Sequence, residues 1–96
     1  MIDNLKLRIQ EYINNRKIVI LGFGKEGRST YHFLRDLFPD YQLCIADSNI
    51  EIRQEKELKE DPYIEFALGE DYLERIEKRV KEFRSEIIIA VENIGD

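Results

Sequence analysis

The fold of this chain is decided by one stretch, Val19-Ile20-Leu21-Gly22-Phe23-Gly24-Lys25-Glu26-Gly27. An apolar run leads directly into glycines with Gly-x-Gly-x-x-Gly spacing, which predicts a buried strand, a tight turn and then a helix. Gly22 allows a turn where a Cβ would clash, and Gly24 allows the backbone to approach a phosphate closely. Gly27 allows the helix to pack close to the strand.

The helix expected after these glycines would direct the N–H groups of its first turn at an anion. An acidic residue, Asp47, follows the next apolar run, at 47 − 27 = 20 positions beyond Gly27. This is the spacing at which an acidic side chain meets the sugar of a bound nucleotide. The sequence therefore predicts a nucleotide site made of Gly22, Phe23, Gly24, Lys25, Glu26, Gly27, Arg28, Asp47, Ser48 and Asn49. The competing interpretation is a glycine-rich turn without a ligand, in which Asp47 is an ordinary loop residue.

Residues 22–29 also nearly spell a different phosphate loop, Gly-x-x-x-x-Gly-Lys-Ser. Arg28 stands where that motif has the lysine that grips the phosphates. No second acidic strand motif for magnesium is evident, and Gly24 with Asp47 fits the dinucleotide type of loop better. An ATPase loop is therefore the less favoured interpretation. Arg28 could still reach a diphosphate, or it could be a solvated charge on an exposed first turn of the helix.

The alternation of apolar and polar segments predicts an α/β chain. Helices are expected over 3–15, 25–38 and 71–84, strands over 17–21, 41–46, 63–68 and 86–91, and a short exposed helix or irregular crossover over 50–60. The connections are too long for hairpins, which favours parallel strands with right-handed crossovers. We expect a Rossmann-like three-layer domain with a parallel sheet of about four strands in the order 3-2-1-4 and helices on both faces. The glycine turn would then lie at the crevice where the strand order reverses, with Glu92 and Asn93 facing it.

Periodicity also predicts which side chains are buried. Helical spacing on one face is found for three sets: Ile2, Leu5, Ile9 and Tyr12; Tyr31, Leu34, Leu37 and Phe38; and Leu73, Ile76, Val80 and Phe83.

Length, composition and net charge argue against some classes of binding partner. The 96 residues are expected to form one domain, 1–96, and the net charge of −5 argues against nucleic acid, which selects basic surfaces. No apolar run reaches the length of a membrane span and no signal-peptide core is evident, so we expect a cytoplasmic location and no membrane partner. Cys44, the only cysteine, lies in an apolar run and is expected to be a buried thiol.

The remaining polar residues do not form a catalytic set in the sequence. His32 is the only histidine and has no neighbouring ligand type, which argues against a metal site. The charge-rich segments 51–60 and 70–86 mix both signs, as solvated helix faces do. The chain by itself therefore indicates a binding module, and we expect no catalytic residue and no cofactor of its own.

The residues around the glycine loop resemble those of a known protein family. Residues 17–30, Lys-Ile-Val-Ile-Leu-Gly-Phe-Gly-Lys-Glu-Gly-Arg-Ser-Thr, followed by Phe33-Leu34 and by Cys44-Ile45-Ala46-Asp47, resemble the N-terminal domain of the Mur ligases, and among these the D-glutamate-adding ligases. The resemblance covers about residues 15–91, with most weight on 17–49. It implies that the chain is the N-terminal part of a longer ligase of peptidoglycan biosynthesis.

The resemblance also implies a ligand. In this family the N-terminal domain binds the UDP end of the substrate, here UDP-N-acetylmuramoyl-L-alanine. The loop 22–27 would hold the diphosphate, and Asp47 with Ser48 would contact the uracil. The ligation itself, with ATP and Mg²⁺, belongs to a central and a C-terminal domain that these 96 residues do not contain, so whether the chain is called an enzyme stays open.

One departure and two alternatives accompany the resemblance. The family tends to follow the fourth strand with Ser-Pro-Gly, whereas this chain has Glu92-Asn93-Ile94-Gly95, so those contacts are not transferred. The first alternative is an NAD-binding domain of a dehydrogenase or of a nucleotide-sensing regulator, since the same turn and aspartate would serve it. The second is an interaction module that binds no nucleotide.

Overall fold

The computed structural model describes residues 2–83 and 87–91 of the chain. Its elements are α1 (Ile2–Ile13), β1 (Lys17–Leu21), α2 (Lys25–Leu37), β2 (Leu43–Asp47), the 3₁₀ helix η1 (Ile50–Gln54), α3 (Lys56–Lys59), β3 (Ile64–Leu68), α4 (Tyr72–Phe83) and β4 (Ile87–Val91). The expected α/β alternation is confirmed, with boundaries that differ from expectation by one or two residues at most ends. The charge-rich segment 50–60 forms η1 and α3.

The strands form a parallel sheet. β1 pairs with β2, and β2 pairs with β3, so that Ile20 lies opposite Ile45 and Ile45 lies opposite Phe66. The backbone of β4 pairs with the other edge of β1, with Ile20 opposite Ala90. Since the carboxyl ends of parallel strands lie at one edge of the sheet, the loops after β1 and β2 are neighbours.

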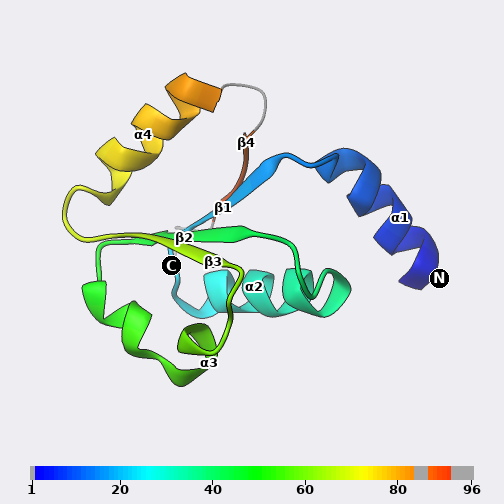
Figure 1. Ribbon diagram of the computed structural model, residues 1–96, viewed down its shortest axis with the longest axis horizontal. Helices are drawn as coiled ribbons and strands as arrows, with labels where there is room; N and C mark the ends of the chain where they lie inside the picture. Colours follow the sequence, from blue (N-terminus) through cyan, green and yellow to red (C-terminus); the bar gives the residue numbers. More distant parts are fainter. Residues whose placement is uncertain (1, 84–86, 92–96) are drawn as a thin grey trace.

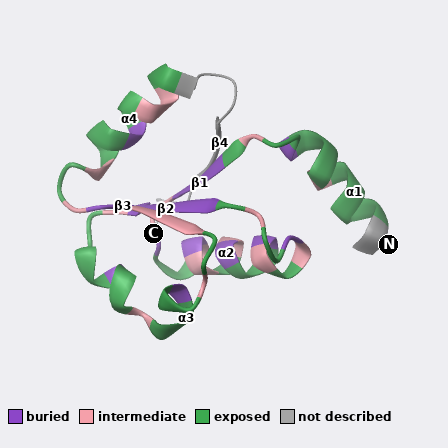
Figure 2. Cartoon of the chain, viewed as in Figure 1, coloured by how far each residue is buried: buried purple, intermediate pink, exposed green. Residues whose placement is uncertain are grey.

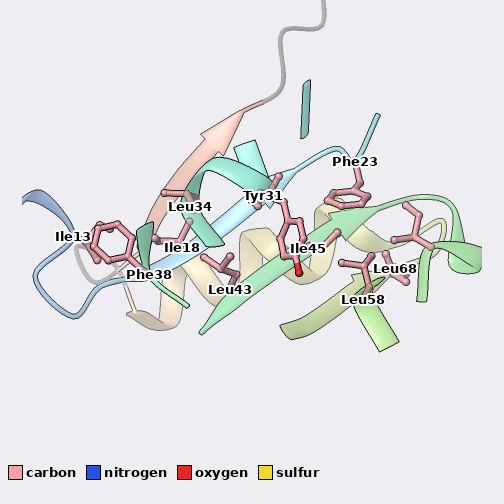
Figure 3. Packing of buried hydrophobic residues seen from close by; sticks show 12 residues of the cluster. Ile13, Ile18, Phe23, Tyr31, Leu34, Phe38, Leu43, Ile45, Leu58 and Leu68 are labelled. Atoms are coloured by element: carbon pink, nitrogen blue, oxygen red, sulfur yellow. The ribbon is translucent and has the colours of Figure 1, made fainter. Parts of the chain in front are cut away.

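Helices cover both faces of this sheet (Figure 1): α2 and α3 lie on one face and α4 on the other. Residues that alternate along the strands separate into two clusters accordingly. Ile18, Ile20, Leu43 and Ile45 pack with Tyr31, Leu34 and Leu58 on the first face (Figure 3). Val19, Cys44, Ala46 and Ala67 pack with Ile76 on the second. Burial on both faces explains why β1 and β2 read as continuous apolar runs.

The packing of the helices agrees with the sequence for α2 and differs for α4. In α2, Tyr31 and Leu34 are buried and Leu37 is half-buried, with Phe38 buried just beyond the helix. In α4 the contact is made by Tyr72, Ile76 and Val80, which are spaced four apart. Leu73, expected in this stripe, lies off that row and is 53% exposed. The side chain of Phe83 lies outside the described residues.

The first helix buries less than expected. Leu5 is 45% exposed and Tyr12 is 67% exposed, and the side chain of Ile2 lies outside the described residues. Instead, Ile13 is buried and Ile9 is half-buried against the core. The reason is the position of α1, which projects beyond the sheet and meets it only through its last turns (Figure 2). The apolar spacing therefore predicted the helix correctly and most of its buried face wrongly.

Two asparagines reverse the chain between α1 and β1. Asn14 and Asn15 have positive φ angles of 43° and 64°, and the Arg16 N–H donates to the Ile13 carbonyl at 2.7 Å. These are the features of a type I′ turn, which asparagine tolerates better than most residues. This turn lets β1 begin only a few residues after α1 ends.

Gly27 is the point of closest approach between α2 and β1. A Cβ at this position would lie 2.1 Å from the carbonyl oxygen of Gly22, a distance that no packed side chain tolerates. The nearest side-chain atom of Ile20 would lie 3.6 Å away. The expectation that Gly27 allows close packing of helix and strand therefore has a direct geometric basis.

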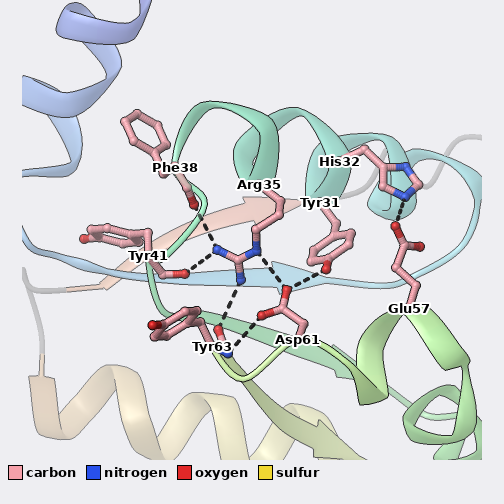
Figure 4. A network of polar contacts seen from close by, with 8 residues as sticks. All are labelled: Tyr31, His32, Arg35, Phe38, Tyr41, Glu57, Asp61 and Tyr63. Atoms are coloured by element: carbon pink, nitrogen blue, oxygen red, sulfur yellow. Dashed lines mark hydrogen bonds and ion pairs between the residues drawn. The ribbon is translucent and has the colours of Figure 1, made fainter.

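A polar cluster ties the far end of α2 to the starts of β2 and β3 (Figure 4). The guanidinium of Arg35 donates to the Phe38 carbonyl at 3.0 Å, to the Tyr41 carbonyl at 2.7 Å and to the Tyr63 carbonyl at 3.2 Å. Its Nε donates to Asp61 Oδ2 at 2.8 Å. The side chains of Arg35 and Asp61 are only 15% and 7% exposed. Because Tyr41 is held in this way, β2 begins at Leu43 and not at residue 41.

Asp61 is the acceptor at the centre of this cluster. Its Oδ2 also accepts the Tyr31 hydroxyl at 2.6 Å, and its Oδ1 accepts the Tyr63 N–H at 2.9 Å. Burial opposes ionisation of this carboxyl, but the hydrogen bonds and the Arg35 charge outweigh burial and hold the Asp61 pKa below its ordinary value. Burial, followed by the bond to Asp61, raises the pKa of Tyr31 to about 12. The cluster is therefore an ionised carboxylate and a neutral phenol at neutral pH.

We predict that Gly27→Ala unfolds the domain or destabilises it by more than about 3 kcal/mol, because a backbone oxygen cannot move aside as a side chain can. Thermal unfolding followed by circular dichroism measures the loss. Ser29→Ala, an exposed substitution on the same helix, is the control and is expected to change little. An unchanged melting temperature for Gly27→Ala would show that α2 does not pack this close to β1.

We predict that Asp61→Asn costs about 1–3 kcal/mol, since it weakens the acceptor of several donors. The folded-state pKa is depressed, so the stability supplied by this carboxylate is present above the unfolded value of 3.8 and lost as pH falls through the lower folded value. Urea unfolding between about pH 2 and pH 7 should therefore show a flatter acid limb for the variant. Asp40→Asn, which changes an exposed carboxylate, should keep the wild-type profile.

Candidate functional site

The glycine loop joins the carboxyl end of β1 to α2. Gly22 has a φ of 93°, in the left-handed region that glycine favours, and its N–H donates to the Ala46 carbonyl at 2.7 Å. The chain therefore turns at Gly22 while it is still attached to β2. Gly24 is the N-cap residue of α2 and has a φ of −82°, so its backbone conformation does not require glycine. The close approach of a phosphate to Gly24 stays a prediction.

The N-terminus of α2 begins without a side-chain cap among the described residues. The first helical bond runs from the Arg28 N–H to the Gly24 carbonyl at 3.0 Å. In any α-helix the N–H groups of the first turn have no acceptor one turn earlier within the helix itself, and they are directed out of its N-terminus. Lys25 is exposed and Glu26 is half-buried in this first turn. The arrangement has the form expected of an anion-binding helix start.

Phe23 contributes its backbone, and not its ring, to this surface. The side chain is 3% exposed and lies in the core, with its ring centroid 6.0 Å from that of Tyr31 in an edge-on contact. Any contact of Phe23 with a ligand would therefore go through its main chain. Sequence inspection alone placed the whole residue in the site.

Asp47 reaches across from β2 to the glycine loop. Its Oδ2 accepts the Phe23 N–H at 2.8 Å, and its Oδ1 accepts the Asn49 N–H at 2.8 Å. The carboxylate is half-buried between the loop and the turn that follows β2. The structure thus brings the predicted aspartate and the predicted loop into direct contact. It also gives Asp47 a structural task, because both oxygens already accept a backbone donor.

The two residues after Asp47 have different surroundings. Ser48 is exposed. Asn49 is exposed too, and its Oδ1 accepts the Glu51 N–H at 3.0 Å, which caps η1. The side-chain oxygen of Asn49 therefore serves the local turn, which is the ordinary use of asparagine at such a position.

Arg28 is held beside the loop by a residue that the sequence did not indicate. Its Nη2 donates to Glu55 Oε2 at 2.7 Å, and its Nη1 donates to Glu55 Oε1, so the pair is bidentate. The Arg28 Cζ also lies 4.8 Å from the centroid of the Phe23 ring. Glu55 follows η1 in a charge-rich segment whose sequence is typical of a solvated face. Nothing local marks one of its many carboxylates as the partner of a residue 27 positions away.

The other residues with possible chemistry are explained by structure. His32 Nε2 lies 2.7 Å from Glu57 Oε1 on the exposed side of α2. Cys44 is buried as expected, and burial raises its pKa to about 11, so the thiol is protonated and inert at neutral pH. Among the described residues there is no cluster of possible metal ligands. The same part of the chain contains no helix that is both long enough and apolar enough to cross a bilayer.

A cavity of about 540 Å³ lies at the opposite end of the strands from the glycine loop. Its lining includes the starts of β1 and β2 together with Glu65 and Arg79. Since Arg79 Nη1 lies 3.2 Å from Glu65 Oε2, the two charges partly neutralise each other there. The predicted site residues 22–28 and 47–49 do not line this cavity.

Comparisons with protein-family models, with curated proteins and with solved structures find no match for this chain. Function is therefore inferred from the residues and their geometry. Glu92, Asn93 and Gly95, which the sequence analysis considered, lie outside the described residues.

We predict that Asp47→Ala lowers the free energy of unfolding by about 1–3 kcal/mol, because the Phe23 and Asn49 N–H groups lose their acceptor. Hydrogen exchange at the Phe23 amide should become faster, while exchange within β1 changes less. Asp47→Asn keeps an acceptor oxygen and is expected to cost less, and Ser48→Ala serves as the neutral control. Unchanged exchange at Phe23 in Asp47→Ala would contradict the contact.

Proposed function

We propose that this chain is a Rossmann-like domain that binds the UDP part of UDP-N-acetylmuramoyl-L-alanine, as the N-terminal domain of a D-glutamate-adding Mur ligase. The proposal includes a sheet of four strands in the order β3-β2-β1-β4, whose order reverses beside the glycine loop. One observation carries it: the Asp47 carboxylate meets the backbone of the glycine loop at 2.8 Å, at the start of α2. The choice of UDP and of the ligase is supported by the sequence resemblance.

The chemistry of binding follows from the groups at this edge. The N–H groups of Gly22 and Phe23 already donate to Ala46 and Asp47. The diphosphate would therefore lie at the positive end of α2 and accept hydrogen bonds from the helix start that follows these two residues. Each Asp47 oxygen accepts one backbone donor and has a second lone pair. That remaining capacity would accept an N–H or O–H group of the uracil or ribose. Lys25 and Arg28 would offset part of the phosphate charge.

In the proposed reaction this chain would bind and orient the substrate. In the ligase, ATP and Mg²⁺ activate the substrate carboxylate in the other domains, and this domain would hold the substrate by its nucleotide end. Weak binding by the isolated domain is expected, since the rest of the ligase would supply further contacts. A cytoplasmic location is part of the same proposal.

One specific observation also supports the alternative of NAD binding. An acidic residue at the end of β2, beside a glycine loop, would serve the ribose of a nicotinamide dinucleotide equally well. The ligand series in the experiment therefore includes NAD. A domain that binds neither nucleotide and forms a dimer would favour the interaction module.

We predict that titration of the ¹⁵N-labelled chain with UDP-N-acetylmuramoyl-L-alanine or UDP, to millimolar concentration, shifts the amide signals of residues 22–28 and 47–49. Asp47→Asn should weaken binding about three- to ten-fold through the lost charged acceptor. Asp71→Asn, which changes an exposed carboxylate before α4, is the matched control. Silence of these amides at millimolar ligand, or tighter binding of NAD than of UDP, would overturn the proposal.

A further inference from the structure

The pair formed by Arg28 and Glu55 lies beside the proposed phosphate site. Arg28 follows directly after the glycine loop, on α2, and its guanidinium lies over the ring of Phe23. The backbone N–H of that same Phe23 donates to Asp47. The guanidinium therefore lies next to the loop. The carboxylate that contacts it belongs to Glu55, the N-cap residue of α3.

Glu55 uses the donors that a phosphate would use. The two Nη atoms of Arg28 donate to the two carboxylate oxygens of Glu55 in a side-by-side fork. A phosphate offers the same pair of acceptors with more charge, which makes a guanidinium fork a common phosphate partner in proteins. While Arg28 donates both groups to Glu55, it cannot give the same fork to a ligand.

The electrostatic surroundings of Arg28 also favour competition. The hydrogen bond with Glu55 is the largest cause that raises the Arg28 pKa, desolvation opposes it, and the charges of Glu55, Glu57 and Asp47 add to the rise. The bond to Arg28 lowers the pKa of Glu55 in turn. The cation is thus surrounded by carboxylates of the protein, and these reduce the positive potential that a diphosphate would meet.

The Arg28–Glu55 pair is open enough to be exchanged. The two side chains are 41% and 33% exposed, so water reaches both charged groups, and breaking the pair leaves neither charge buried without compensation. Arg35, on the same helix, forms a contrasting pair with Asp61 of the loop before β3 (Figure 4). The side chains of Arg35 and Asp61 are 15% and 7% exposed and carry several further hydrogen bonds. The first pair can therefore break without loss of the fold, whereas the second holds elements together.

We propose that Glu55 is an internal competitor of the ligand, which occupies Arg28 until a diphosphate takes the guanidinium and releases the Glu55 carboxylate. The inference rests on the proposed function, and it assigns Glu55 the role of setting the affinity for the diphosphate. Arg28 is then a phosphate contact in the bound state and the partner of Glu55 in the free state.

The test measures binding of UDP, and separately of inorganic pyrophosphate, to the full chain and to its variants. Glu55→Gln is expected to bind both about two- to five-fold more tightly, because the competing charge is gone. Arg28→Met should bind more weakly than wild type. In the double variant the Glu55→Gln gain should vanish, because it acts only through Arg28. Glu60→Gln, an exposed carboxylate at the end of α3, is the control for simple loss of negative charge.

A second measurement follows Glu55 directly in the wild-type chain. The ¹³C signal of its carboxyl should titrate below the ordinary range in the free protein and return towards that range when the protein is saturated with UDP. This readout needs no variant. A Glu55 titration that stays low in the complex would show that the pair persists, and would overturn the inference.

The outcomes separate the two proposals. UDP binding in the wild type with no gain in Glu55→Gln, or a gain that survives Arg28→Met, removes the competitor role and leaves the proposed function standing. Absence of UDP binding in the wild type and in every variant removes the proposed function, and the competitor role with it. Weaker binding in Glu55→Gln would mean that Glu55 positions Arg28 for the ligand, which is the opposite of the inference.

Discussion

The contact between Gly27 and the Gly22 carbonyl is the constraint on which the rest of this structure depends. A methyl group at Gly27 would lie 2.1 Å from that oxygen, so α2 can start beside β1 only if this residue has no side chain. The close approach places the N-terminus of α2 at the carboxyl edge of the sheet. It also places Phe23 between the strand and the helix, with its ring in the core and its N–H turned towards Asp47.

The Asp47 carboxylate couples architecture to the proposed recognition. Its bonds to the Phe23 and Asn49 N–H groups fix the carboxylate before any ligand arrives, so little side-chain entropy remains to be lost on binding. The same bonds fix the glycine loop relative to β2. In the proposed function the same carboxylate holds the loop and recognises the nucleotide, so a substitution at Asp47 changes both the stability of the loop and the affinity for the ligand.

Local patterns in the sequence predicted the elements, the parallel α/β sheet and the meeting of Asp47 with the glycine loop. They predicted the buried face of α2 correctly, since its apolar residues lie directly over the sheet. They failed for Leu5 and Tyr12 of α1, because periodicity marks an apolar face without saying whether another element covers it. They also missed Glu55 and Asp61, which lie in or directly after a segment full of similar charges and are 27 and 26 positions away from their arginine partners. Ion pairs of this kind depend on the assembled fold.

The two arginines of α2 show how burial assigns different roles to the same side chain. Arg35 lies where the helix ends against two strand starts, and its donors satisfy three carbonyls and a carboxylate. Removing any partner there leaves a half-buried charge or carbonyl without compensation. Arg28 lies where the helix begins, at a more open edge, and it shares a single carboxylate. One end of α2 is thus fixed by polar contacts, whereas the other end has a more exposed ion pair, the one that we propose is exchanged for a ligand.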